Sequence, residues 1–167
     1  MNLKAALLST LLGGLAIFMW GAAAHMIPPE PVKVLSDHAA VDDFLAKNAP
    51  RNGSYLDARG VMISVGFLPD RADKSVNMGP QLASEFLTNL LQAFMLYWIL
   101  LRFKRDTILG YGVTGLAIAL FAWVTVELSY WTWYSFSMPL VLMGLLDAVG
   151  SGFLAGAIAG WQIRKSA

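Results

Sequence analysis

Cysteine is absent from this chain of 167 residues, and histidine occurs only twice, as His25 and His38. The absence of cysteine excludes disulfides, thiolate metal sites, iron–sulfur clusters and S-palmitoyl anchors. A bis-histidine haem needs two imidazoles that face each other, and His38 falls in a different predicted segment from His25. The eight methionines offer an alternative haem ligand, but methionine usually serves packing. We therefore predict that the protein binds no haem, and we predict no other cofactor.

Charged residues are scarce as well, because they make up 14% of the chain while hydrophobic residues make up 57%. Soluble domains average roughly 25% charged residues. The net charge of +1 gives no reason to expect a nucleic-acid partner. Nucleotide-binding, serine-hydrolase and zinc-protease motifs are also absent from the sequence. These features favour a non-catalytic protein over an enzyme.

What the chain has instead is four long stretches without a charged residue. These stretches are residues 5–29, 86–101, 107–126 and 128–146. A helix needs about 20 mainly apolar residues to cross about 30 Å of hydrocarbon. We therefore predict an all-α membrane protein, a bundle of four transmembrane helices in a single membrane domain over residues 1–167. The predicted spans are approximately residues 4–26, 81–102, 107–131 and 138–163.

The first span has an alternative interpretation as a secretory signal that is cleaved near Ala22-Ala23-Ala24. Its apolar run extends from Ala5 to about Trp20 and beyond, which is longer than the apolar region of a usual signal peptide. The length of the run therefore favours an uncleaved transmembrane helix.

The basic residues predict the orientation, since Lys and Arg in short loops favour the cytoplasmic side. They lie before the first span, between the second and third, and after the fourth: Lys4, Arg102, Lys104, Arg105, Arg164 and Lys165. With four spans these three places share one side of the membrane. We therefore predict that both termini are cytoplasmic and that residues 27–80 face outward, into the periplasm if the membrane is a bacterial inner membrane.

Residues 27–80 are predicted to form a small α+β segment between the first and second spans. Ser36 is the predicted N-cap of a helix that continues to Lys47. Residues 54–57 and 61–67 predict two short strands joined around Arg59-Gly60. A helix and a hairpin of this size bury little core by themselves, so we expect them to lie on the helix ends or on a partner.

Each predicted span carries one ionisable residue in the outer third of the bilayer: His25, Glu85, Glu127 and Asp147. Their depth follows from counting residues from the cytoplasmic helix ends, at about 1.5 Å each. Asn89 and Gln92 follow Glu85 at helical spacing and form a polar stripe with it. We expect this stripe to face the bundle, because lipid offers no hydrogen-bond partner.

This polar layer has two interpretations. Carboxylates together with one histidine can bind a divalent metal ion or relay protons. Alternatively, the layer is structural and pairs with Arg59 or Arg71 of the outward segment, and the sequence favours this second interpretation because the helix ends are not sharply defined.

The last predicted span contains Gly152, Gly156 and Gly160, which recur every four residues. Small residues at this spacing let two helix backbones approach closely in lipid. We therefore predict a helix contact on this face, and we favour a contact within one chain over a contact between copies.

Several short motifs resemble a family of small bacterial inner-membrane proteins with four helices. The motifs are Phe18-Met19-Trp20-Gly21 with His25-Met26, Met78-Gly79 through Glu85-Phe86-Leu87, and Ser129-Tyr130-Trp131-Thr132-Trp133-Tyr134 with Phe136. The resemblance covers nearly the whole chain. It implies a four-helix membrane protein, but the family has no assigned activity, so it implies no site. Ser129 stands where relatives tend to have proline, which suggests a less broken helix at that point.

Three functions are compatible with these features. The first, which we favour, is a non-catalytic accessory or structural subunit that packs with the lipid bilayer and with other membrane proteins or a second copy. The second is a membrane protein that handles a small solute, protons or metal ions at the outer polar layer. The third is a membrane enzyme with a carboxylate–histidine metal site.

Overall fold

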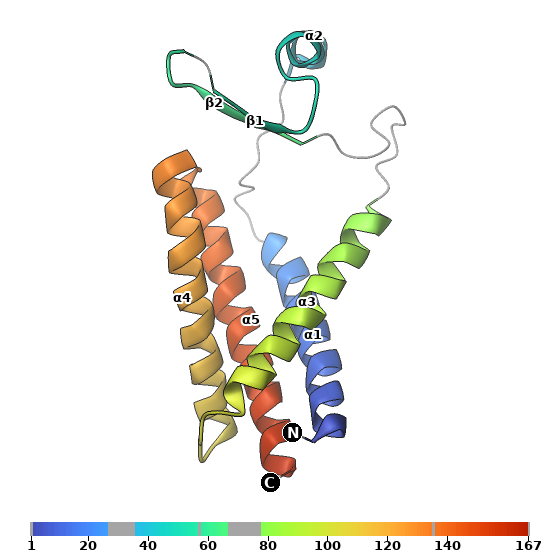
Figure 1. Cartoon of the computed structure of the whole chain (residues 1–167), viewed down its shortest axis with the longest axis vertical. Coiled ribbons are helices and arrows are strands. Elements are labelled where there is room, and N and C mark those ends of the chain that lie inside the picture. Colours follow the sequence, from blue (N-terminus) through green and yellow to red (C-terminus); the bar gives the residue numbers. More distant parts are fainter. Residues whose placement is uncertain (1, 27–35, 57, 67–77, 135, 167) are drawn as a thin grey trace. The chain divides into compact units, whose positions relative to one another are not determined.

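The computed structural model describes residues 2–26, 36–56, 58–66, 78–134 and 136–166. These residues form five helices and one sheet of two antiparallel strands (Figure 1). The elements are α1 Leu3–His25, α2 His38–Asn48, β1 Gly53–Leu56, β2 Met62–Val65, α3 Gly79–Leu100, α4 Ile108–Tyr134 and α5 Met138–Lys165. A mostly helical chain with a small sheet is therefore confirmed. The chain folds as two compact units, one of Met1–Pro31 with Gln81–Ala167 and the other of Val32–Pro80.

Helices α1, α4 and α5 are long and apolar enough to cross a membrane. Three of the four predicted spans are thus helices that could cross a membrane, within the described residues. The remaining predicted span is α3, which has 22 residues and a length of about 33 Å. It is not among the helices apolar enough to cross a membrane, because Glu85, Asn89 and Gln92 lower its hydropathy. Length and composition alone therefore do not establish a bundle of four spans.

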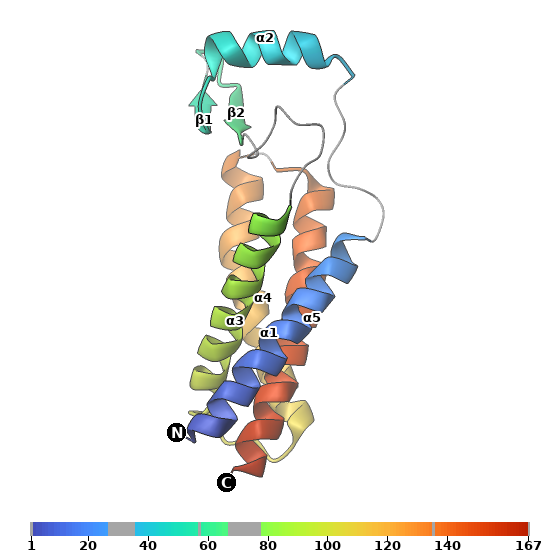
Figure 2. The ribbon, with the colours of Figure 1, turned by 90° about the vertical axis from the view of Figure 1, so that its right-hand side faces the viewer.

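Helix α5 contacts both α4 and α1 along their lengths (Figures 1 and 2). The first turn of α1 and the last turn of α5 lie at the same end of this unit, which we call the basal end; the opposite end is the distal end. Near the basal end, all four helices of the unit contribute to one buried cluster: Ala5, Ala6, Tyr97, Leu100, Tyr111 and Ala159. The helices are therefore held together most tightly near their basal ends.

Helix α3 packs on α1 through a close crossing. Phe18 meets Phe86 edge to face, with the ring centroids 5.6 Å apart. One turn closer to the basal end, a Cβ on Gly14 would lie 3.0 Å from the Cα of Leu90, so any other residue would need the two backbones to move apart. Figure 1 shows that α3 is inclined to α4 and α5, so that their distal ends separate.

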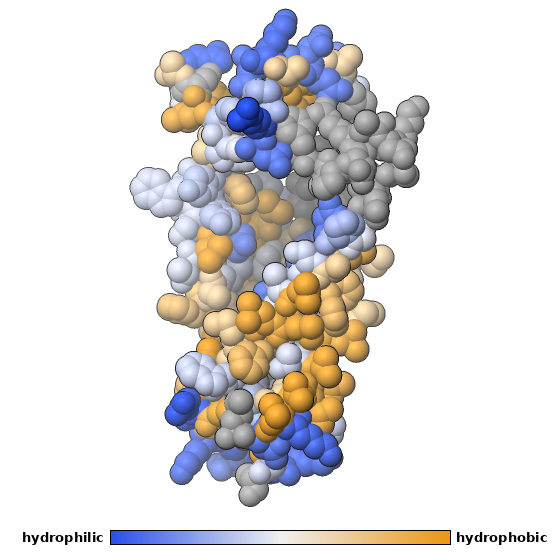
Figure 3. Space-filling model, turned by 45° about the vertical axis from the view of Figure 1, so that its right-hand side comes forward, coloured by the Kyte–Doolittle hydropathy of each residue, from blue (hydrophilic) through white to orange (hydrophobic). Residues whose placement is uncertain are grey.

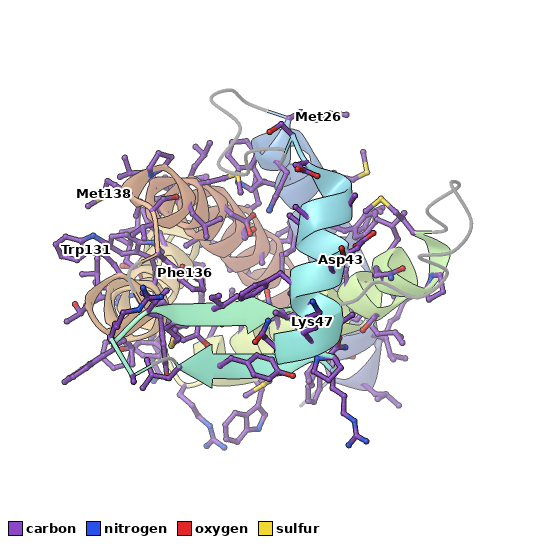
Figure 4. The ribbon with its side chains drawn as sticks, turned by 90° about the horizontal axis from the view of Figure 1, so that it is seen from above. Met26, Asp43, Lys47, Trp131, Phe136 and Met138 are labelled. Atoms are coloured by element: carbon purple, nitrogen blue, oxygen red, sulfur yellow. The ribbon has the colours of Figure 1, made fainter. Side chains whose placement is uncertain are left out.

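The other unit contains α2 and the hairpin of β1 and β2. We predicted Ser36 as the N-cap of α2, and this was wrong by one residue. Asp37 is the N-cap, and its Oδ1 accepts a hydrogen bond of 3.0 Å from the Ala40 N–H. A carboxylate is favoured at this position because it faces the unpaired amides and the positive end of the helix. Figure 4 shows Asp43 and Lys47 one turn apart on α2.

The hairpin has the predicted turn, but β1 begins one residue earlier than predicted and β2 is shorter than the predicted strand. Tyr55 pairs with Ile63 in the register, and the Ser54 and Ser64 hydroxyls are hydrogen-bonded at 3.1 Å. Gly60 has a φ of +83°, a conformation that favours glycine, and it forms part of the turn. Two residues of the predicted strands, Asp57 and Phe67, lie outside the described residues.

Candidate functional site in the distal half of α5

Asp147 is a half-buried carboxylate in the distal half of α5. Its Oδ1 accepts a hydrogen bond of 3.0 Å from the hydroxyl of Ser151, one turn further along the helix. Gly21 of α1 lies opposite this carboxylate, and a Cβ added to Gly21 would lie 3.5 Å from the same Oδ1 atom. The carboxylate therefore faces α1 at a point where α1 has no side chain.

Trp20 fixes α1 against α5 beside this carboxylate. Its Nε1–H donates a hydrogen bond of 3.1 Å to the carbonyl oxygen of Leu146. The indole ring lies on Gly150, where any Cβ would overlap the ring. Because a carbonyl in a helix has a second lone pair, Leu146 can accept this bond in addition to its bond within the helix.

Glu127 reaches α5 from the other side. The side chain of this α4 residue packs on Gly144, whose Cβ would lie 3.3 Å from the Glu127 Cδ and 3.6 Å from its Oε2. Gly144 precedes Asp147 by three residues, so the two carboxylates approach the same two turns of α5. Within the described part of the chain, neither Glu127 nor Asp147 forms an ion pair with a basic residue.

His25 is exposed at the end of α1. Its Nδ1 lies 2.8 Å from the Gly21 carbonyl oxygen, which can only accept, so Nδ1 carries the proton and donates. In the neutral ring this leaves Nε2 as a free acceptor. Gly21 thus connects two predicted residues, because its carbonyl binds His25 and its Cα faces Asp147.

The polar stripe of α3 divides between two environments. Asn89 is buried, with 3% of its surface exposed, whereas Glu85 and Gln92 are exposed. Of the three residues expected to face the bundle, only Asn89 is therefore buried in it. At about 100° per residue, Glu85 and Gln92 lie on one side of Asn89, further from the buried face.

The predicted residues therefore converge only in part. Asp147, Glu127 and His25 lie around one region of α5 and α1, whereas Glu85 and Gln92 do not join them. Among the residues with described placement, no three His, Asp or Glu side chains form a group that could hold a metal ion. The arrangement therefore places single carboxylates, and not a cluster of ligands, around this region within the described residues.

The regularly spaced glycines of α5, Gly152, Gly156 and Gly160, lie against α4. A Cβ on Gly156 would lie 2.7 Å from the Tyr111 carbonyl oxygen and 3.1 Å from the Gly115 Cα. A Cβ on Gly152 would lie 2.8 Å from the Gly115 carbonyl oxygen, and one on Gly160 would lie 2.6 Å from the Tyr111 ring. Distances below 3.0 Å are not tolerated by real Cβ atoms, so α4 and α5 are in backbone contact along this face.

Two features were missed by the sequence analysis. One is the contact of the Trp20 ring with Gly150. The other is a set of glycines on α4 and α1 that lie against a neighbouring helix. Gly112 and Gly115 in α4 and the pair Gly13-Gly14 in α1 were the available signals. Small residues on two different helices would have predicted which helices meet.

Comparison of the chain with protein-family models, with curated proteins and with solved structures finds no match. The resemblance to a family of bacterial four-helix proteins therefore stays a prediction from the motifs alone.

Proposed function

We propose that the chain is an integral membrane protein of a bacterial inner membrane with four spans, in which α3 is the second span. Its length of 22 residues and its packing on α1 support this role. The basic residues at the basal end support a cytoplasmic location for both termini, with the unit Val32–Pro80 on the outer side. Reporter fusions after Ala167 and within residues 40–75 should report opposite sides. An exported carboxyl terminus would contradict this topology.

We infer that the protein acts as a non-catalytic accessory subunit that binds other membrane helices. The observation that carries this inference is the opening between the helices at the distal end. Figure 3 shows the surface hollowed there, between α4 on one side and α3 on the other. Large apolar side chains remain exposed on both helices, among them Leu87 of α3 and Phe121 of α4, the latter 74% exposed. A further helix, from another protein or a second copy, would cover such a surface by packing in lipid.

Photo-crosslinking in the intact membrane tests this proposal. A photoreactive amino acid at Leu87 or Phe121 should give one adduct of defined mass that contains a second polypeptide. The matched control is Leu7, an exposed α1 residue in the basal half, which should give only lipid adducts. If Leu87 and Phe121 also give only lipid adducts, the accessory-subunit proposal is wrong.

A second candidate function is proton handling, and Asp147 favours it. This carboxylate is half-buried on a membrane helix, and its hydrogen-bond partner among the described residues is a neutral hydroxyl. Carboxylates on membrane helices are common members of proton-transfer chains in pumps and transporters. Purified protein in liposomes should then carry a proton current that Asp147→Asn removes, while Glu85→Gln, at an exposed position, leaves the current unchanged. A wild-type current equal to that of protein-free liposomes excludes this function.

A further inference from the structure

A cleft of about 220 Å³ lies at the basal end, between the first turn of α1 and the last turn of α5. Polar and basic residues form one part of its wall, and Ala5 and Leu8 form an apolar part. The polar lining residues are Asn2, Lys4, Gln162, Lys165 and Ser166. No Asp or Glu is among its lining residues within the described part of the chain, so the cleft is positively charged.

The helix ends around the cleft also favour an anion. At the start of α1 the Asn2 side chain accepts the Ala5 N–H, which leaves the amides of Leu3 and Lys4 without an acceptor inside the helix. At the end of α5 the Ser166 hydroxyl shares its one proton between the carbonyls of Gln162 and Ile163, which occupies part of the negative end of this helix. The amides at the start of α1 can therefore donate to an anion bound at this end of the helix.

Gln162 is the second, independent indication of a ligand. It is only 4% exposed and lines the cleft, yet its side-chain amide has no hydrogen-bond partner among the described residues. Its amide atoms are not among the fully buried, unpaired atoms of the described residues, so they are open to the cleft, where a bound group can reach them. An amide N–H₂ beside two lysines is suited to donate to a phosphate oxygen.

We propose that this cleft binds the phosphodiester group of an anionic phospholipid. Lys4 and Lys165 supply the charge, Gln162 donates a hydrogen bond, and Leu8 borders the start of an acyl chain. The apolar wall and the position at the end of three membrane-length helices favour a lipid over a free phosphate ion. The proposal needs only that the helices lie in a membrane; it is independent of the accessory-subunit function.

Native mass spectrometry of the full-length protein in a mild detergent tests the site. With phosphatidylglycerol and phosphatidylcholine of equal chain length, the wild type should retain phosphatidylglycerol preferentially. Lys165→Gln should lower this retention about five-fold, the effect of one basic group at a lipid surface. Gln162→Leu should lower it to a similar extent although the net charge does not change.

Lys104→Gln is the matched control, because it removes the same charge at the basal end but outside the cleft. Melting temperatures in lipid-free detergent show whether Gln162→Leu still folds. If it does not fold, Lys4→Gln replaces it as the second test of the cleft, because Lys4 is exposed and its substitution should not affect folding. Equal losses for Lys104→Gln and Lys165→Gln would overturn the site, since they would indicate only a diffuse attraction. Equal retention of both lipids would also overturn it. Inorganic phosphate that raises the melting temperature as much as phosphatidylglycerol would overturn the assignment to a lipid.

Discussion

Helices α4 and α1 both pack on α5, but they do so by different means. The α4–α5 contact is made by backbones, with Gly115 against Gly152 and Gly156. The α1–α5 contact in the distal half depends on one large side chain, Trp20, which covers Gly150 and donates to a carbonyl. Backbone contact orders no flexible side chain and gains dispersion along a whole face. A single indole gives one directional hydrogen bond at one level of the two helices. The neighbouring residue, Gly21, has no side chain, so space remains beside Asp147.

This difference accounts for the location of the candidate site. Where glycines let two backbones touch, no space remains for a ligand or an ionisable group. Where a tryptophan holds the helices, a carboxylate fits beside it. Next to the connection between α4 and α5, the ring centroids of Tyr130 and Phe136 lie 5.3 Å apart, and Figure 4 labels Phe136 and Trp131 in this region.

The largest expected difference between the two contacts is their response to one added methyl group, tested in two separate variants. Gly156→Ala should lower the free energy of unfolding by about 1–3 kcal/mol, because the added Cβ meets backbone atoms that cannot move aside. Gly21→Ala should change it by less than about 1 kcal/mol, because its Cβ makes an ordinary contact with Asp147. Thermal unfolding in a mild detergent measures both. Equal melting temperatures for the two variants would mean that the two contacts do not differ.

The next effect tests the tryptophan contact. Trp20→Phe removes the hydrogen bond to Leu146 and part of the ring on Gly150, so we expect a loss of about 1–2 kcal/mol. Trp133→Phe is the control, since Trp133 is 78% exposed. If both substitutions shift the melting temperature equally, then Trp20 does not hold α1 to α5.

A smaller effect of opposite sign should follow from Asp147→Asn. Asparagine keeps an oxygen to accept the Ser151 hydroxyl, and it removes a charge that is unfavourable in hydrocarbon. We expect the free energy of unfolding in lipid nanodiscs to rise by about 1 kcal/mol or less. A clear destabilisation by Asp147→Asn, with Glu85→Gln silent, would instead reveal a basic partner for the carboxylate.

The smallest effect should be confined to the other unit. Asp37→Ala removes the N-cap of α2 and should destabilise that helix locally by about 1 kcal/mol, whereas Ser36→Ala should not. Hydrogen exchange of the α2 amides measures the change. The melting temperature of the helices around α5 should stay at its wild-type value. This result would show that the stability of α2 does not depend on the α4–α5 or the α1–α5 contact.

Much of the helical framework could be predicted from the sequence, because long apolar runs define helix positions in any membrane protein. The predicted spans end within about three residues of the observed helices. The second predicted span, α3, could not be established as a membrane-crossing helix, because Glu85, Asn89 and Gln92 lower its apolar character. The N-cap of α2 was misplaced because Ser36 and Asp37 are both good capping residues, and only the backbone conformation selects between them.

The candidate site was predictable as a set of residue types but not as an arrangement. Counting residues gives the depth of a side chain, whereas its direction depends on the rotation of each helix about its axis. That rotation is set by contacts such as Trp20 on Gly150, which join residues far apart in the sequence. This is why Asn89 is buried while Glu85 is exposed, although both belong to one polar stripe.

The bond between Trp20 and Leu146 has a consequence for the order of assembly during synthesis. Its two residues are 126 positions apart, whereas Trp123 of α4 and its acceptor, the Val141 carbonyl, are separated by only 18. At about 5–20 residues per second, α1 waits roughly 6–25 s for its acceptor after it has been made. The α4–α5 hairpin can close almost at once. We therefore expect a nascent chain arrested before Leu146 to leave Trp20 open to a lipid-attached fluorescence quencher, and the completed chain to protect it.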